Sequence, residues 1–275
     1  MPEGVTRYPR WHGTLDGPVA WRVVLETTVR AALRGTWSLL AVMVGIFWGL
    51  ASVVELAQLR QGGTAVHDTQ WYIDMLGQLR WFALAVAAVV GGPALLEDQR
   101  RGALELYMTR SLDEGRYLLG RAGGVLLLTF SVFLVPIILY YLGATIFFRH
   151  NPTGWHGDWA LGWVYALVWS LLVTGLALGL SAVARSSRGA ALILLGGVAG
   201  LEIIVSRLLA GLTGNERLQI LSPFAAMDQQ GVWLWNLPPP HAFPLWWAVA
   251  EVAALLVLGW ALVAWRRPRV RGAEA

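Results

Sequence analysis

Three carboxylates lie inside long apolar stretches of the sequence, at Glu55, Glu202 and Glu251. A charged carboxylate is costly inside a lipid bilayer, so it normally faces a hydrogen-bond partner or a water-filled path. Glu55 lies one turn from the end of its stretch, where an interfacial group is expected. Glu202 and Glu251 lie deeper and are candidate translocation-path residues, although a hydrogen-bonded contact between helices is the commoner role. Glu202 can also pair with Arg207 if its helix is tilted.

Composition excludes most kinds of catalytic site. The chain has no cysteine, which rules out disulfides, thiolate metal sites and cysteine nucleophiles. All 21 basic residues are arginine, so the phosphate-binding loop G-x-x-x-x-G-K-S/T cannot occur. The protease motif H-E-x-x-H and the hydrolase motif G-x-S-x-G are absent as well. We therefore predict no catalytic residue and no cofactor bound by this chain.

The histidines do not suggest a metal centre. Their spacing matches no established ligand motif, and no thiolate is present to complete a site. The four histidines concerned are His67, His150, His156 and His241. We expect all four on the outer side of a membrane and predict no metal site.

The composition is that of a membrane protein. Hydrophobic residues make up 56% of the 275 residues, charged residues only 14%, and the mean hydropathy is +0.55. A membrane-spanning helix needs about 20 mostly apolar residues. Six stretches meet this requirement, at residues 37–59, 75–96, 125–148, 161–184, 189–209 and 244–265. We therefore predict an all-α integral membrane protein with six transmembrane helices.

The second of these stretches is the least regular. Its uninterrupted apolar part is short and contains Gly91, Gly92 and Pro93, so the helix must be extended through the turn that carries Arg80. The sequence predicts that Arg80 snorkels to the membrane surface. The arginines support this span, because six crossings with both termini in the cytoplasm place most of the 21 arginines inside.

We therefore expect a protein of the cell membrane whose chain has three regions. Residues 1–35 form a cytoplasmic N-terminus, residues 36–266 a transmembrane domain, and residues 267–275 a basic cytoplasmic tail.

The segment DGPVAWRVVLETTVRAALRGTW precedes the first span and has helical periodicity. Its charged residues recur every four positions, on one helix face. The other faces are mostly apolar, so the segment predicts an amphipathic helix lying on membrane lipid at the inner surface. A solvated surface helix is the alternative. The residues that define the helix are Trp21, Arg22, Glu26, Arg30 and Arg34.

The most charged segment of the chain, EDQRRGALELYMTRSLDEGRYLLGR, lies between the second and third apolar stretches. Leu104, Tyr107, Met108 and Leu112 fall at helical spacing and form a small apolar face. A short amphipathic helix held by two spans would provide a contact for another protein. The alternative is a charged loop that only joins two spans.

This segment resembles the signature of ABC-2 (type-2) ABC transporter permeases. A glutamate at the inner end of span two, a Gly-small-Leu-Glu-Leu run and a Leu-Leu-Gly-basic entry to span three recur in that family. Ser111 stands where a proline is frequent and Arg121 where a lysine is usual. The matching residues here are Glu97, Gly102, Ala103, Leu104, Glu105, Leu106, Arg116, Leu118, Leu119, Gly120 and Arg121.

The resemblance extends to the layout of the chain. Family members have an N-terminal elbow helix at the membrane surface, six spans and a very short inner loop between spans four and five, here residues 185–188. The run Leu-Ser-Pro-Phe at 221–224 looks like the family's outer re-entrant region.

The resemblance implies the permease subunit of an exporter. Such permeases pair with a second permease copy or paralogue and with ABC ATPase subunits, which bind ATP and Mg. The loop at 97–123 then contains a coupling helix seated on the ATPase. The residues implied in coupling are Glu97, Gly102, Leu104, Glu105, Leu106, Tyr107, Met108, Arg110 and Arg116.

Two other functions remain open at the level of sequence. The chain could be a mechanotransmitter that passes ATP-driven movement to an extracytoplasmic protein. It could also be a secondary transporter, although no matched pair of broken helices is visible in its two halves. No nucleic-acid partner is expected.

Overall fold

The computed structural model describes residues 20–61, 69–100, 114–147 and 155–265. Their regular structure is entirely helical. Among these residues, five helices are long and apolar enough to cross a membrane. They are Trp71–Arg100, Glu114–Phe147, Trp159–Val183, Ser187–Thr213 and Leu245–Trp265.

These five helices contain several labelled elements. The first combines α3 (Thr69–Val86), the π-helical turn η1 (Ala87–Gly91), α4 (Gly92–Ala94) and α5 (Leu96–Arg100). The second is α7 (Glu114–Phe147), and the third belongs to α8 (Trp155–Val183). The fourth combines α9 (Ser187–Gly200), the π-helical η2 (Leu201–Leu209) and α10 (Ala210–Thr213), and the fifth is α12 (Leu245–Trp265).

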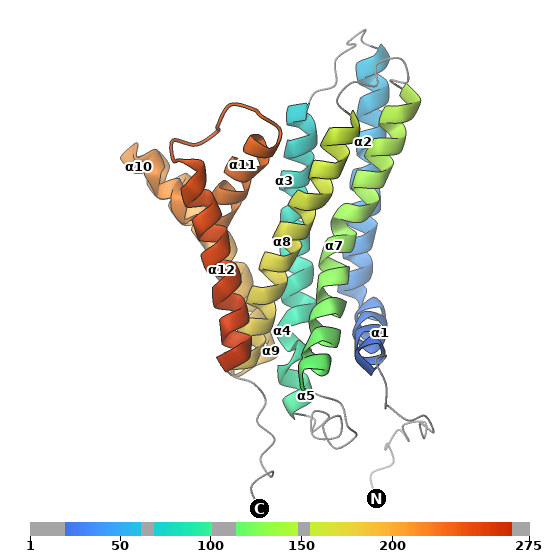
Figure 1. Cartoon of the computed structure of the whole chain (residues 1–275), viewed down its shortest axis with the longest axis vertical. Coiled ribbons are helices and arrows are strands. Elements are labelled where there is room, and N and C mark those ends of the chain that lie inside the picture. The colour runs from blue at the N-terminus through green and yellow to red at the C-terminus, as the bar shows by residue number, and fades with distance from the viewer. Residues whose placement is uncertain (1–19, 62–68, 101–113, 148–154, 266–275) are drawn as a thin grey trace, which may run out of the picture.

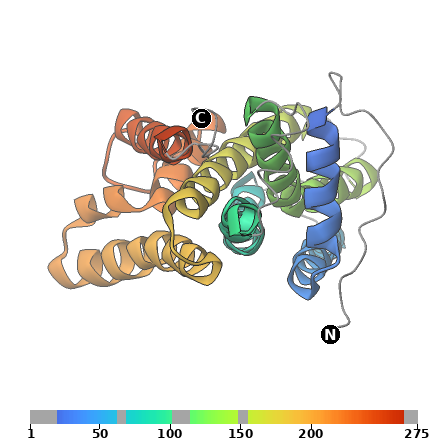
Figure 2. The same cartoon turned by 90° about the horizontal axis from the view of Figure 1, so that it is seen from below.

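A further long helix, α2 (Thr36–Gln61), packs beside α7. It has 26 residues and contains the apolar stretch Met43–Gln58. Close packing follows from small residues, because a methyl group at Gly45 would lie 3.2 Å from the carbonyl oxygen of Val132 on α7. The helix α1 (Ala20–Leu33) precedes α2 and lies across the bundle end, roughly perpendicular to the long helices (Figures 1 and 2).

The long helices form two groups (Figure 1). In one, α2, α3, α7 and α8 lie close together; in the other, α9, α10, α11 and α12 diverge from them toward the end opposite α1. The end that carries α1 also holds the end of α5, the start of α7, the turn between α8 and α9, and the end of α12. We call this the α1 end.

The helix Trp71–Arg100 continues through Gly91, Gly92 and Pro93 without ending. Proline lacks a backbone N–H and clashes with the carbonyl four residues earlier, which normally kinks a helix. The wider turn η1 lies immediately before Pro93, and such turns are known sites of helix distortion. After the proline, the Ser181 hydroxyl on α8 accepts the N–H groups of Leu95 and Leu96 at 3.1 and 3.3 Å.

The core is centred on α3 and α8. The buried side chains include Leu76, Leu79 and Leu84 of α3, Phe133 of α7 and Trp169 of α8. By contrast, α9 to α10 and α12 expose large apolar side chains: Leu192, Val257 and Leu212 are 69%, 67% and 75% exposed. Water-soluble proteins rarely expose apolar surface this extensively, so this surface suits lipid.

The segment between α10 and α12 folds back into the bundle. Gly214, with a φ of +64°, ends α10 in the left-handed conformation that glycine adopts without strain. The 3₁₀ helix η3 (Glu216–Leu221) and α11 (Pro223–Leu234) follow. Ser222 caps α11, because its hydroxyl accepts the N–H groups of Phe224 and Ala225, and Pro223 occupies the first helical position.

Candidate functional site

Most of the predicted coupling residues lie outside the described residues. These are Gly102, Leu104, Glu105, Leu106, Tyr107, Met108 and Arg110. Glu97 lies on α5 and Arg116 on α7, which are the elements that flank residues 101–113. The structure therefore describes how the two flanks of the predicted coupling segment are held.

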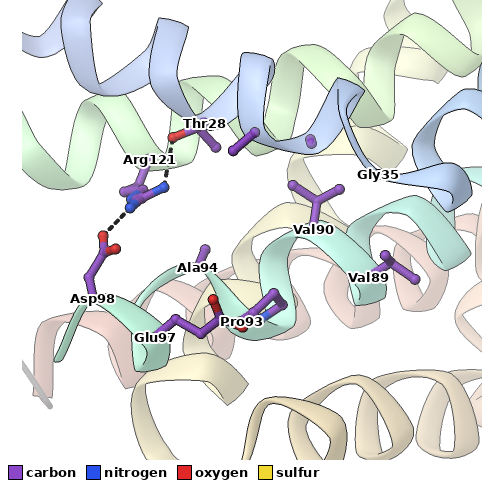
Figure 3. A pocket seen from close by; sticks show the side chains of 11 residues that line it. Thr28, Gly35, Val89, Val90, Pro93, Ala94, Glu97, Asp98 and Arg121 are labelled. Atoms are coloured by element: carbon purple, nitrogen blue, oxygen red, sulfur yellow. Dashed lines mark hydrogen bonds and ion pairs between the residues drawn. The ribbon is translucent and has the colours of Figure 1, made fainter. Parts of the chain in front are cut away.

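The two flanks are joined by a polar cluster that we call the α5–α7 junction, formed by Asp98, Tyr117, Arg121 and Thr28. Tyr117 donates its hydroxyl to Asp98 Oδ2 at 2.5 Å, and Arg121 Nη2 forms an ion pair with the same oxygen. Arg121 Nη1 donates to Thr28 Oγ1 of α1 at 3.0 Å. Figure 3 shows Arg121 between Asp98 and Thr28. One arginine therefore connects three elements.

Burial makes this junction energetically important. Asp98 is 9% exposed and Tyr117 fully buried. Removing one partner of a buried ion pair leaves an uncompensated charge and costs about 3–5 kcal/mol. Nothing in the sequence distinguishes Asp98 from its charged neighbours, and Arg121 stands out only as part of the family resemblance. An acidic residue at the end of an apolar helix was the available signal, but its partner is 23 residues away.

Helix α1 rests directly on α7. Val24 is 3% exposed at this contact. A methyl group at Gly120 would lie 2.6 Å from the Trp21 carbonyl oxygen, and one at Gly124 would lie 2.7 Å from Thr28 Cβ. The glycines of α7 therefore allow the two backbones to approach closely. Asp98 and Arg121 line a cavity of about 330 Å³ between α1, α4 and α7 (Figure 3).

The charged face predicted for α1 is present. Arg22, Glu26, Arg30 and Arg34 are all exposed. Arg30 Nη2 and Glu26 Oε1 form an ion pair at 2.5 Å, with side chains 70% and 58% exposed. Trp21 lies at the opposite side, where its carbonyl group approaches Gly120. The buried side of α1 faces α7, which the sequence alone did not indicate.

Arg80 does not snorkel to the surface, so that prediction is wrong. The residue is 4% exposed. Its Nη1 donates to the Phe224 carbonyl oxygen at 2.7 Å, and its Nη2 forms an ion pair with Asp228. The reason is that α11 folds back over α3 and supplies both acceptors.

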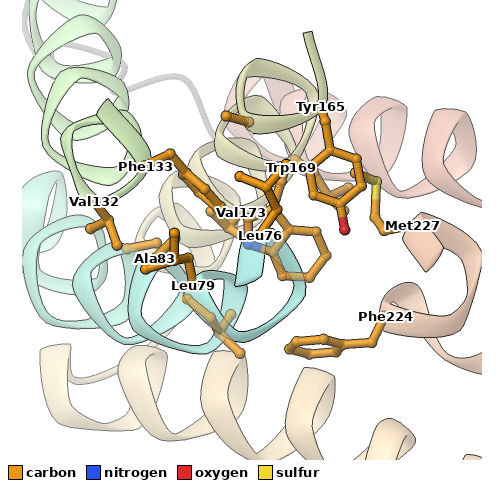
Figure 4. Close-up of a cluster of buried hydrophobic side chains, with 14 of the residues drawn as sticks. Leu76, Leu79, Ala83, Val132, Phe133, Tyr165, Trp169, Val173, Phe224 and Met227 are labelled. Atoms are coloured by element: carbon orange, nitrogen blue, oxygen red, sulfur yellow. The ribbon is translucent and has the colours of Figure 1, made fainter. Parts of the chain in front are cut away.

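Aromatic rings complete the surroundings of this arginine. Its guanidinium carbon lies 5.1 Å from the Phe224 ring centroid, 5.7 Å from that of Trp169 and 5.8 Å from that of Tyr165. Figure 4 shows these three rings near one another, with Tyr165 and Trp169 on α8 and Phe224 on α11. Cation–π attraction in such a desolvated site is worth about 2 kcal/mol. We call Arg80, Asp228 and these rings the Arg80 cluster.

Glu202 makes the helix contact that its position suggested. It is 8% exposed and accepts a hydrogen bond from the Ser222 hydroxyl at 2.5 Å. Arg207 Nε lies 3.1 Å from its other carboxylate oxygen, which confirms the expected pair. The spacing of five residues suits the π-helical geometry of η2.

Glu251 lies on α12 and has no such contact. Its Oε2 atom is buried and has no hydrogen-bond partner among the described residues. A role of either glutamate in a translocation path stays a prediction.

A second cavity, of about 390 Å³, adjoins the Arg80 cluster and is called here the α3–α11 cavity. Carboxylates from three elements border it: Asp74 on α3, Glu202 on η2 and Asp228 on α11. His241 borders it too and has a ring nitrogen 2.8 Å from Gln219 Oε1. No group of three metal-binding side chains occurs in the part of the chain that the structure describes.

No family model and no curated protein matches this chain. Its function therefore has to be inferred from its own residues and their arrangement.

Proposed function

We propose that the chain is the permease subunit of an ATP-driven exporter of the ABC-2 class. In this proposal α2 is the first of six spans, followed by the five long apolar helices, and α1 is the elbow helix. The α1 end and both termini face the cytoplasm of the cell membrane. ATP and Mg are bound by separate ATPase subunits, and a second permease copy or paralogue completes the transmembrane unit.

The distribution of arginines supports this orientation. Arg22 and Arg30 lie on α1 and Arg34 directly follows it. Other arginines lie near the same end, on α5, at the start of α7, in the turn from α8 to α9 and at the start of α9. This second group comprises Arg100, Arg116, Arg121, Arg185 and Arg188. Toward the opposite end the described residues include Arg60, Arg207 and Arg217. Such asymmetry favours the cytoplasm at the α1 end.

The observation that carries the proposal is the α5–α7 junction. Asp98 precedes the predicted coupling segment and Arg121 follows it, and the buried pair holds the two flanks together. Arg121 also binds Thr28 of α1. A force applied to the segment by an ATPase would therefore reach α5, α7 and α1 together, because all three elements share one side-chain network.

The absence of lysine agrees with a coupling segment that contacts a separate ATPase. Without a phosphate-binding loop of the G-x-x-x-x-G-K-S/T type, this chain needs another source of energy. A separate ATPase supplies that energy, and the apolar face of Leu104, Tyr107 and Met108 is the contact proposed for it.

Reconstitution tests the proposal. The chain is purified in lipid nanodiscs alone and together with the ABC ATPase that co-purifies with it from its native membrane. We expect hydrolysis only in the complex, and reduced assembly or loss of stimulation by the membrane domain in Asp98→Asn. Strong hydrolysis by the homogeneous chain would contradict the proposal. So would unaltered assembly and hydrolysis in both Asp98→Asn and Met108→Asp.

A secondary transporter is the second candidate, favoured by one feature. The π-helical segments η1 and η2 occur in the second and the fifth of the six apolar helices, which are corresponding positions in two halves. Both segments remain helical and expose no unwound backbone of the kind that binds ions in such transporters. Uptake driven by an ion gradient in liposomes without any ATPase would establish this alternative.

A further inference from the structure

The α3–α11 cavity combines a polar lining with an apolar surrounding. Its volume of about 390 Å³ falls in the range of small-molecule sites, about 300–1,000 Å³. Trp81 and Phe224 stack with ring centroids 4.2 Å apart and form an apolar wall. The element η2 forms another wall, and its Ile203 and Ile204 are each 54% exposed on the outside. A molecule with a polar head and a short apolar chain matches both features.

The charges around the cavity favour a cationic head. Three carboxylates line it, from Asp74, Glu202 and Asp228, against the two guanidinium groups of Arg80 and Arg207. Carboxylates therefore outnumber guanidinium groups in the lining. Coulomb attraction to these carboxylates favours a cation over an anion at this site.

The basic groups are poorly placed to bind an anion instead. Arg80 already donates to the carbonyl oxygens of Gly77 and Phe224 and pairs with Asp228. Arg207 pairs with Glu202. An incoming carboxylate or phosphate would have to displace these partners. Asp228, by contrast, is 36% exposed and engages Arg80 through Oδ1, so its Oδ2 remains available as an acceptor.

We propose that the α3–α11 cavity binds the ammonium group of a cationic amphiphile, with Asp74 and Asp228 as its carboxylate partners. The apolar chain lies against Trp81 and along η2. That such an amphiphile is also the substrate of an exporter rests on the proposed function. Binding itself needs no ATPase and can be measured with the chain alone.

The test uses the full chain in nanodiscs of neutral phosphatidylcholine and isotope-labelled octylammonium as the probe. Empty nanodiscs correct for partitioning into lipid, and labelled octanoate serves as the anionic counterpart. We expect saturable binding of octylammonium and no saturable binding of octanoate. Saturable octanoate binding of equal affinity, or no saturable octylammonium binding, would overturn the proposal.

Two opposite charge changes locate the site. Asp74 and Gln78 are one helical turn apart, both exposed, and both border the cavity, so either can be changed without disturbing the core. Asp74→Asn should weaken octylammonium binding by about three- to tenfold, and Gln78→Glu should strengthen it by a similar factor. Glu26→Gln on α1 is the matched control and should leave the affinity unchanged. Unchanged affinity in both cavity variants would refute the site.

This experiment separates the two proposals. If octylammonium does not bind, the cavity assignment is wrong, but the chain can still assemble with an ATPase. If the chain does not assemble with an ATPase, the exporter proposal is wrong, but the measured affinity for octylammonium still stands.

Discussion

Asp98 of α5 and Arg121 of α7 form a buried ion pair that connects the two flanks of the most charged segment in the chain. Tyr117 donates to the same Asp98 oxygen, and Thr28 of α1 accepts from Arg121. The two ends of a polar segment in an otherwise apolar sequence are thus attached to each other, and to α1, by side chains that satisfy one another. In the proposed function this attachment would let the segment transmit movement.

Replacing Asp98 with asparagine should destabilise the protein markedly. Arg121 would keep its charge in a buried site without its counterion, which costs about 3–5 kcal/mol. The free energy of unfolding, measured in mild detergent with increasing sodium dodecyl sulfate, checks this. Glu26→Gln removes a carboxylate from the exposed pair with Arg30 and should cost less than about 1 kcal/mol. Equal effects of the two variants would argue against the junction.

A larger side chain at Gly120 should displace α1 from α7. Valine there would collide with the Trp21 carbonyl group and with Val24. Because the chain has no cysteine, a Val24→Cys variant provides a clean reporter. We expect its maleimide reaction to be slow when Gly120 is present and at least tenfold faster with Gly120→Val. Gly197→Val, where a methyl group meets nothing within 4 Å, is the control.

Replacing Arg80 with leucine should weaken the packing of α11 on α3 and lower the free energy of unfolding. The buried Phe224 carbonyl oxygen would lose its donor and the partly exposed Asp228 its counterion, with a destabilisation of about 1–3 kcal/mol. The double variant Arg80→Leu with Asp228→Leu should recover much of this loss, because no unpaired charge remains. Unfolding free energies of the single and double variants measure it. Arg30→Leu leaves only the exposed Glu26, whose side chain is 58% exposed, and should cost far less.

A carboxylate in the predicted coupling face should uncouple transport from hydrolysis. Leu104→Asp or Met108→Asp would place a charge where we expect burial against the ATPase, and a desolvated carboxylate without a matching cation is unfavourable. Assembly, hydrolysis and transport by the reconstituted complex are the measurements. Gly62→Asp, in a segment predicted to lie outside, should have little effect. Normal transport by the Met108→Asp complex would show that this segment is only a connecting loop.

Membrane orientation can be measured with single cysteines. Ser187→Cys should react only with reagent admitted to the cytoplasm, and His156→Cys only with impermeant reagent added outside. Labelling of position 187 from outside would invert the proposed topology.

The helical architecture follows from composition and periodicity. A long apolar stretch has no way to satisfy its backbone in lipid except as a helix, so the five long helices required no tertiary information. The exposed charged face of α1 followed similarly from a four-residue repeat. The continuity of the helix through Pro93 was less evident from the sequence, because it involves the wider turn η1 before the proline, which only the structure shows.

The polar contacts inside the bundle were decided by tertiary structure. The sequence predicted that Arg80 snorkels to the surface, because its partner Asp228 is 148 positions away and reaches it only after α11 folds back. Asp98 was not distinguished from its charged neighbours, since Arg121 becomes its partner only when α5 and α7 are adjacent. Sequence determines which charges must be neutralised in an apolar environment. The packing of distant helices determines which residue neutralises each one, because hydrogen bonds and ion pairs act only over a few ångströms.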